Sequence, residues 1–306
     1  MERVAPPGAI VRAYPAAQYP SAWSRRLRMF FSALRSDHLI LNFSLPDVLF
    51  FTVMLAVVPR RCRITTLDLF LGPLRGRRLR VMRWSLHRVD RLLVYFKNSR
   101  VFQEKLGLPA SRFRYVPFKV NAIERIRQTP ATDEGFIFCG GRSQRDFATF
   151  FAAVEPLGYP VKIVTSPEAE MRPHRSSLAG LRIPSNVEIL TKDSDAAFFV
   201  RTMAAARLVV IPIVPDSTTQ AGIAVYLQAM ALGKCVVISD GLGAGDVLSG
   251  QAILVPPGDK DALRAAIQRA WEDAAVRNRY AAAGQSYALA LGGEDELRRS
   301  VWNALP

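Results

Sequence analysis

Two arginines lie beside a pair of glycines in the segment GGRSQRDF, residues 140–147. An apolar run precedes the glycines, so Arg142 and Arg145 fall in the turn between an expected strand and an expected helix. Glycine lets the backbone approach a ligand, the start of a helix offers unpaired N–H groups, and guanidinium groups donate forked hydrogen bonds. We therefore take Gly141, Arg142 and Arg145 as candidate ligands of a diphosphate. An ordinary strand-to-helix turn with solvated arginines accounts for the same residues equally well.

A second group of small and polar residues lies between Thr218 and Ile267. Its order is a loop, a short helix, a buried strand, a glycine-rich turn, an apolar segment and PPGD, which caps another helix. Gln220 and Gln228, eight residues apart, bracket the first helix. This order is typical of half of a nucleotide-binding α/β domain, in which small residues stand where the backbone meets a ligand or another element.

Signals for other chemistry are weak or missing in the sequence. GLGAGD, residues 241–246, matches half of a dinucleotide-binding motif and comes late in its domain, so we interpret it as a tight turn lining the cleft. The chain has no Walker A lysine, no HExxH motif and no nucleophile elbow, and its three histidines are dispersed. We expect no metal and no cofactor. The three cysteines are expected to be buried free thiols in a reducing cytoplasm.

Alternating strands and helices must position these residues in the second part of the chain. An apolar strand begins at Phe136 and leads into the glycine turn, and the run Lys260–Leu291 is interpreted as two packed helices. Ligands of parallel α/β sheets bind at the carboxyl ends of the strands, where the candidate residues would lie. Further strands are expected at Val161–Thr165, Val187–Leu190 and Leu208–Ile213, and a helix at about Asp195–Ala205.

The first part of the chain shows the same alternation, which predicts a largely parallel sheet. A hydrophilic stretch, Asn121–Gly135, follows and is interpreted as an interdomain connection. We expect strands at Ala9–Arg12, His38–Phe43, Arg63–Leu67, Arg91–Phe96 and Phe113–Pro117, and helices at Ser21–Leu34, Leu45–Val58, Arg77–Arg88 and Ser99–Leu106.

The expected fold is α/β, with two Rossmann-like domains facing each other across a cleft. A chain of 306 residues exceeds what one hydrophobic core usually fills. We assign residues 1–128 to a basic first domain and residues 129–306 to a second domain. The last helix, from about Asp295, could return to the first domain.

Positive charge is concentrated in the first domain. Residues 1–128 hold 24 Lys and Arg against 7 Asp and Glu, whereas the remainder holds 17 against 19. Such a field attracts anionic lipid, nucleic acid or an acidic substrate, although a solvated basic surface explains it too. The apolar run Val48–Val58 is about half the length of a membrane-spanning helix. It is expected to be a buried helix, and the alternative is that it dips into a bilayer surface. The start of the chain lacks a signal-peptide pattern, and we expect none.

The basic segment at residues 72–96 alternates arginine with Leu, Val, Met and Trp84 at helical spacing. A helix with arginines on one face and apolar residues on the other suits an anionic membrane surface. A helix packed on the core with a solvated basic face remains the alternative.

Several of these segments together resemble the C-terminal domain of GT-B glycosyltransferases, in particular the family 4 (group 1) retaining enzymes. They are GGRSQRDF, VVIPI, QAGIAVYLQAMALGKCVVISD and ILVPPGDKDALRAAI. The upstream LGLPASRFRYVPFKVN resembles the segment that leaves the N-terminal domain of those enzymes, and the similarity covers about residues 90–275.

The resemblance implies that residues 1–128 form a shortened acceptor domain and residues 129–306 the donor domain. It also implies roles for individual residues. Arg142 and Arg145 would grip the donor diphosphate, and Gln220 and Gln228 stand where the family carries two glutamates eight residues apart. Gln228 would hold the ribose through weaker, neutral hydrogen bonds, and Gln220 would approach the sugar. The backbone N–H groups of Ala221, Gly222 and Ile223 would face phosphate or sugar oxygens, and Lys192 completes the set of donor-binding candidates.

Asp68 is the candidate polar group of the first domain. It stands in TTLDLFLG, where the family often has a histidine after a central strand. Its carboxylate could orient or deprotonate an acceptor hydroxyl, and it could equally cap a helix.

The favoured function is transfer of a sugar from a nucleotide diphosphate donor to a lipid-linked or cell-envelope glycan acceptor, as in polysaccharide biosynthesis. The resemblance implies retention of anomeric configuration and no metal. We expect a cytoplasmic protein, peripheral on the inner face of the cell membrane. Because both glutamates of the family are amides here, an inactive binding or scaffold subunit is the alternative. Nucleic-acid binding has the least support, since no recognised motif for it is present.

Overall fold

The computed structural model describes residues 4–58, 62–69, 76–192, 195–215 and 217–306. The chain divides into two compact units, of which unit 1 comprises Met1–Pro117 with Asp295–Pro306, and unit 2 comprises Phe118–Glu294. The division thus comes before the expected boundary at residue 128. The last helix, α12 (Glu294–Asn303), lies almost entirely in unit 1, where the carbonyl of Ala304 accepts a hydrogen bond from Arg91.

Unit 1 is built on a four-stranded parallel sheet whose spatial order, β1-β2-β3-β4, follows the chain. The four strands expected from His38 onward are present as β1 (His38–Asn42), β2 (Arg63–Leu67), β3 (Arg91–Val94) and β4 (Phe113–Tyr115). The strand expected at Ala9–Arg12 is wrong, because these residues form no strand and Ile10 is 85% exposed. Prolines stand close by at positions 6, 7 and 15, and a proline cannot donate the backbone hydrogen bond that a neighbouring strand requires.

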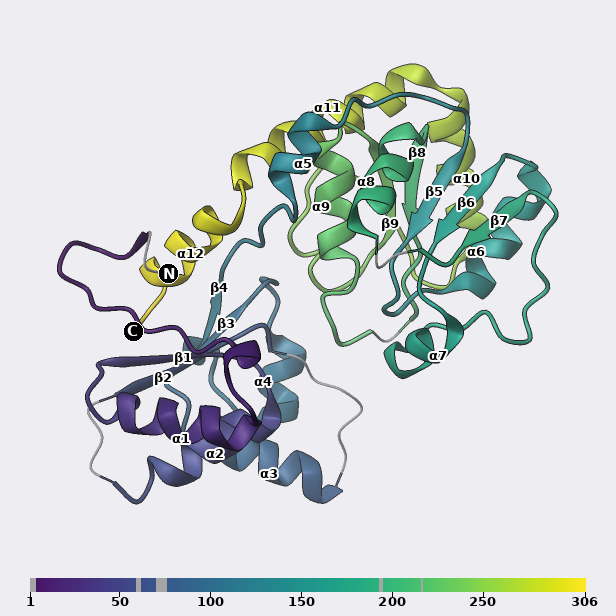
Figure 1. Ribbon diagram of the computed structural model, residues 1–306. Helices are drawn as coiled ribbons and strands as arrows, with labels where there is room; N and C mark the ends of the chain where they lie inside the picture. The colour runs from purple at the N-terminus through teal and green to yellow at the C-terminus, as the bar shows by residue number, and fades with distance from the viewer. Residues whose placement is uncertain (1–3, 59–61, 70–75, 193–194, 216) are drawn as a thin grey trace. The chain divides into compact units, whose positions relative to one another are not determined.

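Four helices accompany this sheet: α1 (Ala22–Ala33), α2 (Leu45–Met54), α3 (Gly76–Leu86) and α4 (Arg100–Leu106). Figure 1 shows α1, α2 and α3 on one side of the sheet. A capping box between Ser21 and Ser24 begins α1. As expected, the apolar run from Val48 begins within a packed helix, because Val48 and Phe51 of α2 are completely buried. No helix among the described residues is long and apolar enough to cross a membrane.

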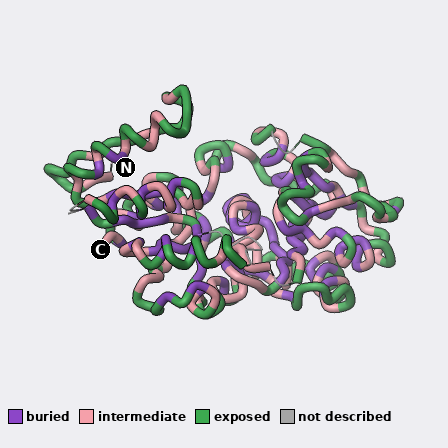
Figure 2. The backbone as a smooth tube through the Cα atoms, turned by 90° about the horizontal axis from the view of Figure 1, so that it is seen from below, coloured by how far each residue is buried: buried purple, intermediate pink, exposed green. Residues whose placement is uncertain are grey.

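Unit 2 contains a six-stranded parallel sheet in the order β10-β9-β8-β5-β6-β7. Residues of β5, β8 and β9 are buried throughout, and Figure 2 shows buried backbone in the interior of this unit with exposed backbone around it. The strands are β5 (Ile137–Gly140), β6 (Val161–Val164), β7 (Val187–Leu190), β8 (Leu208–Ile211), β9 (Cys235–Ser239) and β10 (Ile253–Val255).

Helices follow most strands of unit 2, as expected for βαβ units. Helix α10 packs against α6, and α11 packs against α9, so the sheet is covered on both faces. The expected pair of helices over Lys260–Leu291 is confirmed. The helices are α5 (Ile123–Gln128), α6 (Phe147–Val154), α7 (Glu168–Met171), α8 (Ala196–Ala205), α9 (Ile223–Ala231), α10 (Lys260–Glu272) and α11 (Ala274–Leu291).

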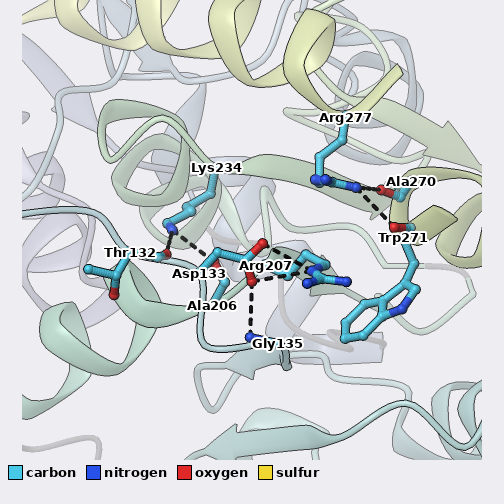
Figure 3. Close-up of polar contacts among 9 residues, drawn as sticks. All are labelled: Thr132, Asp133, Gly135, Ala206, Arg207, Lys234, Ala270, Trp271 and Arg277. Atoms are coloured by element: carbon cyan, nitrogen blue, oxygen red, sulfur yellow. Dashed lines mark hydrogen bonds and ion pairs between the residues drawn. The ribbon is translucent and has the colours of Figure 1, made fainter. Parts of the chain in front are cut away.

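The hydrophilic stretch Asn121–Gly135 belongs to unit 2 and is not a free connection. Figure 3 shows its last residues held by side chains from the amino ends of two strands. Buried Lys234 donates hydrogen bonds to the carbonyls of Thr132, at 2.5 Å, and Ala206, at 2.7 Å. Arg207 pairs with Asp133 at 3.0 Å. The polar residues that suggested a linker therefore fasten this segment to the sheet. All three cysteines are free and buried, as expected.

Candidate active site

The chain reverses its direction of travel across the unit 2 sheet between β5 and β8. From β5 it proceeds to β6 and β7 on one side, and it then returns to β8 on the other side of β5. The loops that leave the carboxyl ends of β5 and β8 consequently diverge, and ligands of open α/β sheets bind at such a switch point. The two segments with predicted chemistry, residues 140–147 and the start of α9, follow these two strands.

Gly141 opens the loop after β5. Its φ of 93° is readily available only to glycine, and its N–H donates to the carbonyl of Val164 at 3.1 Å. A Cβ at this position would lie 3.4 Å from Val225 in the first turn of α9. The loop after β5 therefore approaches the beginning of α9 closely, as a shared ligand site requires.

Arg142 is the exposed arginine of this loop. Its side chain is 53% exposed, and its Nη1 lies 3.8 Å from Oε2 of Glu170, which is exposed to a similar degree. An ion pair of this length and exposure is weak. The guanidinium can therefore exchange Glu170 for an anionic ligand at little cost.

Arg145 points in the opposite direction, into the protein. It is 3% exposed, and its guanidinium donates to the carbonyls of Gly140, at 2.9 Å, and Ser143, at 2.6 Å. Burial lowers the pKa of Arg145 to about 10. The backbone N–H of the same residue donates to Oγ of Ser176 at 2.8 Å. Arg145 thus holds the loop in shape from within.

Neighbouring backbone fixes the same loop. The N–H of Asp146 donates to Pro212 at 3.1 Å, and the N–H of Val214 donates to Gln144 at 3.0 Å. Gln144 also donates from its own N–H to His174 at 2.9 Å and has a φ of 59°, which is uncommon for a residue with a side chain. The loop is consequently rigid, with Arg142 as its outward-facing cation.

Helix α9 begins at the same switch point without a side-chain cap. Gly222, its N-cap residue, has a φ of 84°, and a Cβ there would lie 2.9 Å from Ile211. Gly222 has no side chain that could cap the first turn of α9. The first N–H groups of a helix have no partner within it and carry partial positive charge. The start of α9 is therefore an anion-binding end, beside Gly141.

The predicted backbone donors at this end are not equivalent. The N–H of Ala221 already donates to the carbonyl of Thr219 at 2.8 Å, whereas Gly222 and Ile223 stand at the head of α9. Gln220 precedes them and is partly buried.

Gln228 lies in α9, and Lys192 follows β7. The Nε2 of Gln228 donates to the backbone carbonyl of Asn121 at 3.2 Å, a bond that a carboxylate could not make. Lys192 is exposed, with its Nζ 5.2 Å from the ring centre of Phe198 on α8. It stands at the carboxyl end of the edge strand β7.

The glycine segment after β9 is a tight turn, as the sequence predicts. Gly243 has a φ of 80°, its N–H donates to Oδ1 of Asp246 at 2.8 Å, and its carbonyl accepts from the Tyr226 hydroxyl at 2.7 Å. Because Tyr226 belongs to α9 and is buried, this bond ties the turn to the helix that begins the site.

The candidates within unit 1 are Asp68 and the basic helix α3. Asp68 follows β2 with a φ of 64°, and its N–H donates to the carbonyl of Leu93 at 3.1 Å. Helix α3 is amphipathic as predicted, with Met82 and Leu86 buried. The Arg88 guanidinium lies 3.9 Å from the ring centre of Trp84. The exposed arginines of α3 are Arg77, Arg78, Arg80 and Arg83.

Sequence reasoning missed several residues that shape this site. Glu170, Ser176, Gln144 and Tyr226 were not singled out. Ser176 contacts Arg145 across 31 positions of sequence, so no local pattern could signal it. Within the parts of the chain that the structure describes, no three His, Cys, Asp or Glu side chains gather as metal ligands.

Two parallel α/β units, one carrying an anion-binding switch point, define the architecture of a GT-B protein. The family of group 1 glycosyl transferases matches residues 115–273, more than half of the chain. The protein therefore belongs to the group 1 glycosyltransferases and is an enzyme of that class. No curated protein sequence matches it.

Solved structures share this fold at low sequence identity. HepE of Anabaena in complex with UDP-glucose superposes with a TM-score of 0.69 at 17% identity, covering 91% of this chain and 81% of HepE. Sucrose-phosphate synthase of Thermosynechococcus elongatus gives 0.67 at 19% identity, covering 91% and 77%. An α,α-trehalose-phosphate synthase (UDP-forming) of Burkholderia vietnamiensis gives 0.64 at 14% identity, covering 92% and 75%.

Proposed function

We propose that the protein transfers a sugar from a nucleotide diphosphate donor to a lipid-linked or cell-envelope glycan acceptor, with retention of anomeric configuration. The observation that carries the donor half is the short distance between the loop that bears Arg142 and the start of α9, where a Cβ at Gly141 would lie 3.4 Å from Val225. An exposed cation, Arg142, and a helix N-terminus therefore stand at the same switch point, and both favour the negative charge of a diphosphate. HepE, which shares the fold, was solved with UDP-glucose.

In this proposal the departing diphosphate is stabilised by fixed positive charge. Arg142 contacts it, and the N–H groups of Gly222 and Ile223 donate to its oxygens. Arg145 contributes by holding Gly141 and Arg142 in place, since its own donors are engaged with Gly140 and Ser143.

The remaining candidates have supporting roles in the same proposal. Gln220 approaches the sugar, Gln228 offers Oε1 to the ribose, and Lys192 faces the nucleotide. In unit 1, Asp68 orients or deprotonates the acceptor hydroxyl. No metal is required.

The acceptor half of the proposal rests on charge. The exposed arginines of α3 and the surplus of basic residues over positions 1–128 favour an anionic surface or an anionic acceptor. We accordingly propose a cytoplasmic enzyme of polysaccharide biosynthesis, peripheral on the inner face of the cell membrane.

Nucleotide binding is the first test. Calorimetric titration with UDP, GDP, ADP and dTDP should identify one diphosphate that binds with sub-millimolar affinity. The Arg142→Ala variant should weaken that binding by more than about tenfold, because it removes a charge-assisted contact. The donor-site proposal fails if none of the four nucleotides binds at that level.

An inactive binding or scaffold subunit is the second candidate, and the amides at Gln220 and Gln228 favour it. Turnover separates the two functions. The matching nucleotide sugar is incubated with the protein and membrane extract, and release of free nucleotide is measured. Steady release that stops in the Arg142→Ala variant supports the transferase. Tight nucleotide binding without release supports the scaffold.

A further inference from the structure

Helix α1 carries large apolar side chains on its exposed surface. Trp23, Leu27 and Phe31 are 62%, 45% and 63% exposed, and Leu34, which follows the helix, is 38% exposed. Positions spaced by four residues lie above one another on a helix, so these side chains form one stripe. We call Trp23, Leu27, Phe31 and Leu34 the α1 stripe. Single exposed apolar residues are ordinary, whereas a continuous stripe of four marks an interaction surface.

The packing of α1 on unit 1 fixes the stripe outward. Phe30 and Ala33 are buried against the unit, and Arg25 and Arg26 both bind the carboxylate of Asp47 in α2, at 2.7 and 2.6 Å. Because one face of α1 is buried and two of its arginines are ion-paired with α2, the helix cannot turn about its axis to bury the α1 stripe. The Trp23 ring meets Phe50 in a T-shaped contact, with 5.7 Å between ring centres, and the Arg26 guanidinium lies 5.6 Å from its centre.

The surroundings of the stripe decide its partner. Exposed Arg28 and Arg35 flank it, and the surplus of Lys and Arg over Asp and Glu across residues 1–128 makes unit 1 strongly positive. A second copy of the chain would bring two such fields together, and a nucleic acid would leave the apolar side chains in water. An anionic bilayer satisfies both features, because its headgroups pair with arginines while the boundary beneath them accepts Trp, Leu and Phe.

We propose that α1 is a membrane anchor that lies in the plane of an anionic bilayer and inserts Trp23, Leu27 and Phe31 below the headgroups. The inference deepens the membrane part of the proposed function and rests on it. It differs from attraction to the α3 arginines in its physical origin. Salt screens charge attraction, whereas it leaves apolar insertion in place.

Vesicle sedimentation tests the anchor with the full chain. Vesicles of equal parts phosphatidylcholine and phosphatidylglycerol should bind the wild-type protein, and the Trp23→Ser/Phe31→Ser variant should bind more than about tenfold more weakly. The matched control is Val101→Ser/Ile183→Ser, which removes two apolar residues of similar exposure away from the stripe and should bind like the wild type. Equal binding of all three proteins would overturn the inference.

Fluorescence gives a second readout that a folding defect cannot imitate. Lipids brominated along the acyl chain should quench the wild-type emission, and Trp23→Phe should lose most of that quenching. Trp271→Phe is the control, because Trp271 stacks on Tyr159 in unit 2 and should leave the quenching intact. Quenching that persists in Trp23→Phe, or binding by the stripe to an acidic protein and not to vesicles, contradicts the inference.

Nucleotide titration without lipid separates this result from the proposed function. The Trp23→Ser/Phe31→Ser variant should bind the nucleoside diphosphate with wild-type affinity. Vesicle binding by a protein that binds no nucleotide would sink the donor proposal and leave the anchor standing. If the protein bound the nucleotide and did not bind vesicles, the anchor would be refuted and the donor proposal would stand.

Discussion

Arg145 packs its guanidinium so closely over Gly141 that a Cβ at Gly141 would come within 2.6 Å of the arginine Nη2. The two residues depend on each other. Gly141 leaves the space that lets the guanidinium reach the carbonyls of Gly140 and Ser143, and the guanidinium in turn holds the backbone on which Arg142 stands. A glycine that looks like a generic turn residue is therefore part of a buried polar arrangement.

Replacing Gly141 by alanine should destabilise the protein and weaken nucleotide binding. The φ of 93° costs an alanine about 1–2 kcal/mol, and displacement of the Arg145 guanidinium adds to that, for a total of about 2–4 kcal/mol. Urea unfolding measures the loss. Gly158→Ala is the matched control, since its φ is also positive, at 65°, but nothing lies within 4 Å of the added Cβ. Equal losses in the two variants would contradict the packing argument.

The two arginines of the loop should respond differently to substitution by methionine. Arg145→Met leaves the carbonyls of Gly140 and Ser143 without their donor and should cost about 2–4 kcal/mol of unfolding free energy. Arg142→Met removes an exposed side chain with one weak ion pair and should change stability by less than about 0.5 kcal/mol. Calorimetric binding of the nucleoside diphosphate should fall more than about tenfold for Arg142→Met. Equal losses of stability in the two variants would contradict the structural role assigned to Arg145 and the ligand-binding role assigned to Arg142.

Most elements of this fold can be predicted from the sequence because they are local. The strand expected at Arg63–Leu67 ends where β2 ends, and the strand at Val187–Leu190 matches β7 in the same way. Both are short runs that contain several β-branched residues, RITTL and VEIL. The strand expected at Ala9–Arg12 had the same local appearance and failed, since pairing partners and a buried face are properties of the whole chain.

The site could be predicted only in outline. The turn containing Arg142 and Arg145 was placed correctly between β5 and α6, but the opposite directions of the two side chains were not foreseen. Those directions follow from the loop dihedrals at Gly141 and Gln144 and from the distant Ser176. The hydrophobic periodicity of a sequence carries no information on loop dihedrals or on contacts between distant residues.

Replacing Gln228 by glutamate should destabilise the protein at neutral pH. The Nε2 of Gln228 donates to the Asn121 carbonyl at 3.2 Å. An ionised carboxylate has no proton to donate, so its oxygen would face the carbonyl oxygen, and both groups only accept hydrogen bonds. We expect Q228E to lose about 1–3 kcal/mol at pH 7. The loss should shrink as the pH approaches about 4, where a glutamate side chain is protonated and can donate.

Gln103→Glu is the control for this prediction. The Nε2 of Gln103 donates to the hydroxyl of Ser99 at 2.9 Å, and that hydroxyl can reverse its role and donate to a carboxylate. The Q103E variant should therefore show little loss at pH 7. A Q228E protein as stable as the wild type would mean that the bond to Asn121 contributes nothing.

The burial of Lys234 makes the stability of the protein depend on pH. Its ammonium group lies in the interior at the amino end of β9, bonded to Thr132 and Ala206 (Figure 3). Burial lowers the pKa of Lys234 from 10.5 to about 8, an effect that nearby Asp133 partly offsets. Below about pH 8 the folded protein therefore carries a desolvated charge, which costs free energy relative to the unfolded chain.

The sign of the effect follows from proton binding. Between about pH 8 and 10.5 the unfolded chain holds a proton on this lysine that the folded protein has released, so the contribution of Lys234 to stability rises with pH across that window. The buried thiols of Cys139 and Cys235, whose pKa values are raised to about 12, act in the opposite sense, because the unfolded chain loses its thiol protons first.

Comparison with Lys234→Met isolates the lysine, because both thiols are present in both proteins. The destabilisation caused by Lys234→Met, measured by urea unfolding with the thiols kept reduced, should be small at pH 7, where lost hydrogen bonds and a relieved charge oppose each other. It should grow at pH 10, where the neutral amine of the wild type still donates to Thr132 and Ala206. A difference between the proteins that stays constant or shrinks from pH 7 to pH 10 would show that the pKa of Lys234 is not lowered in the folded state.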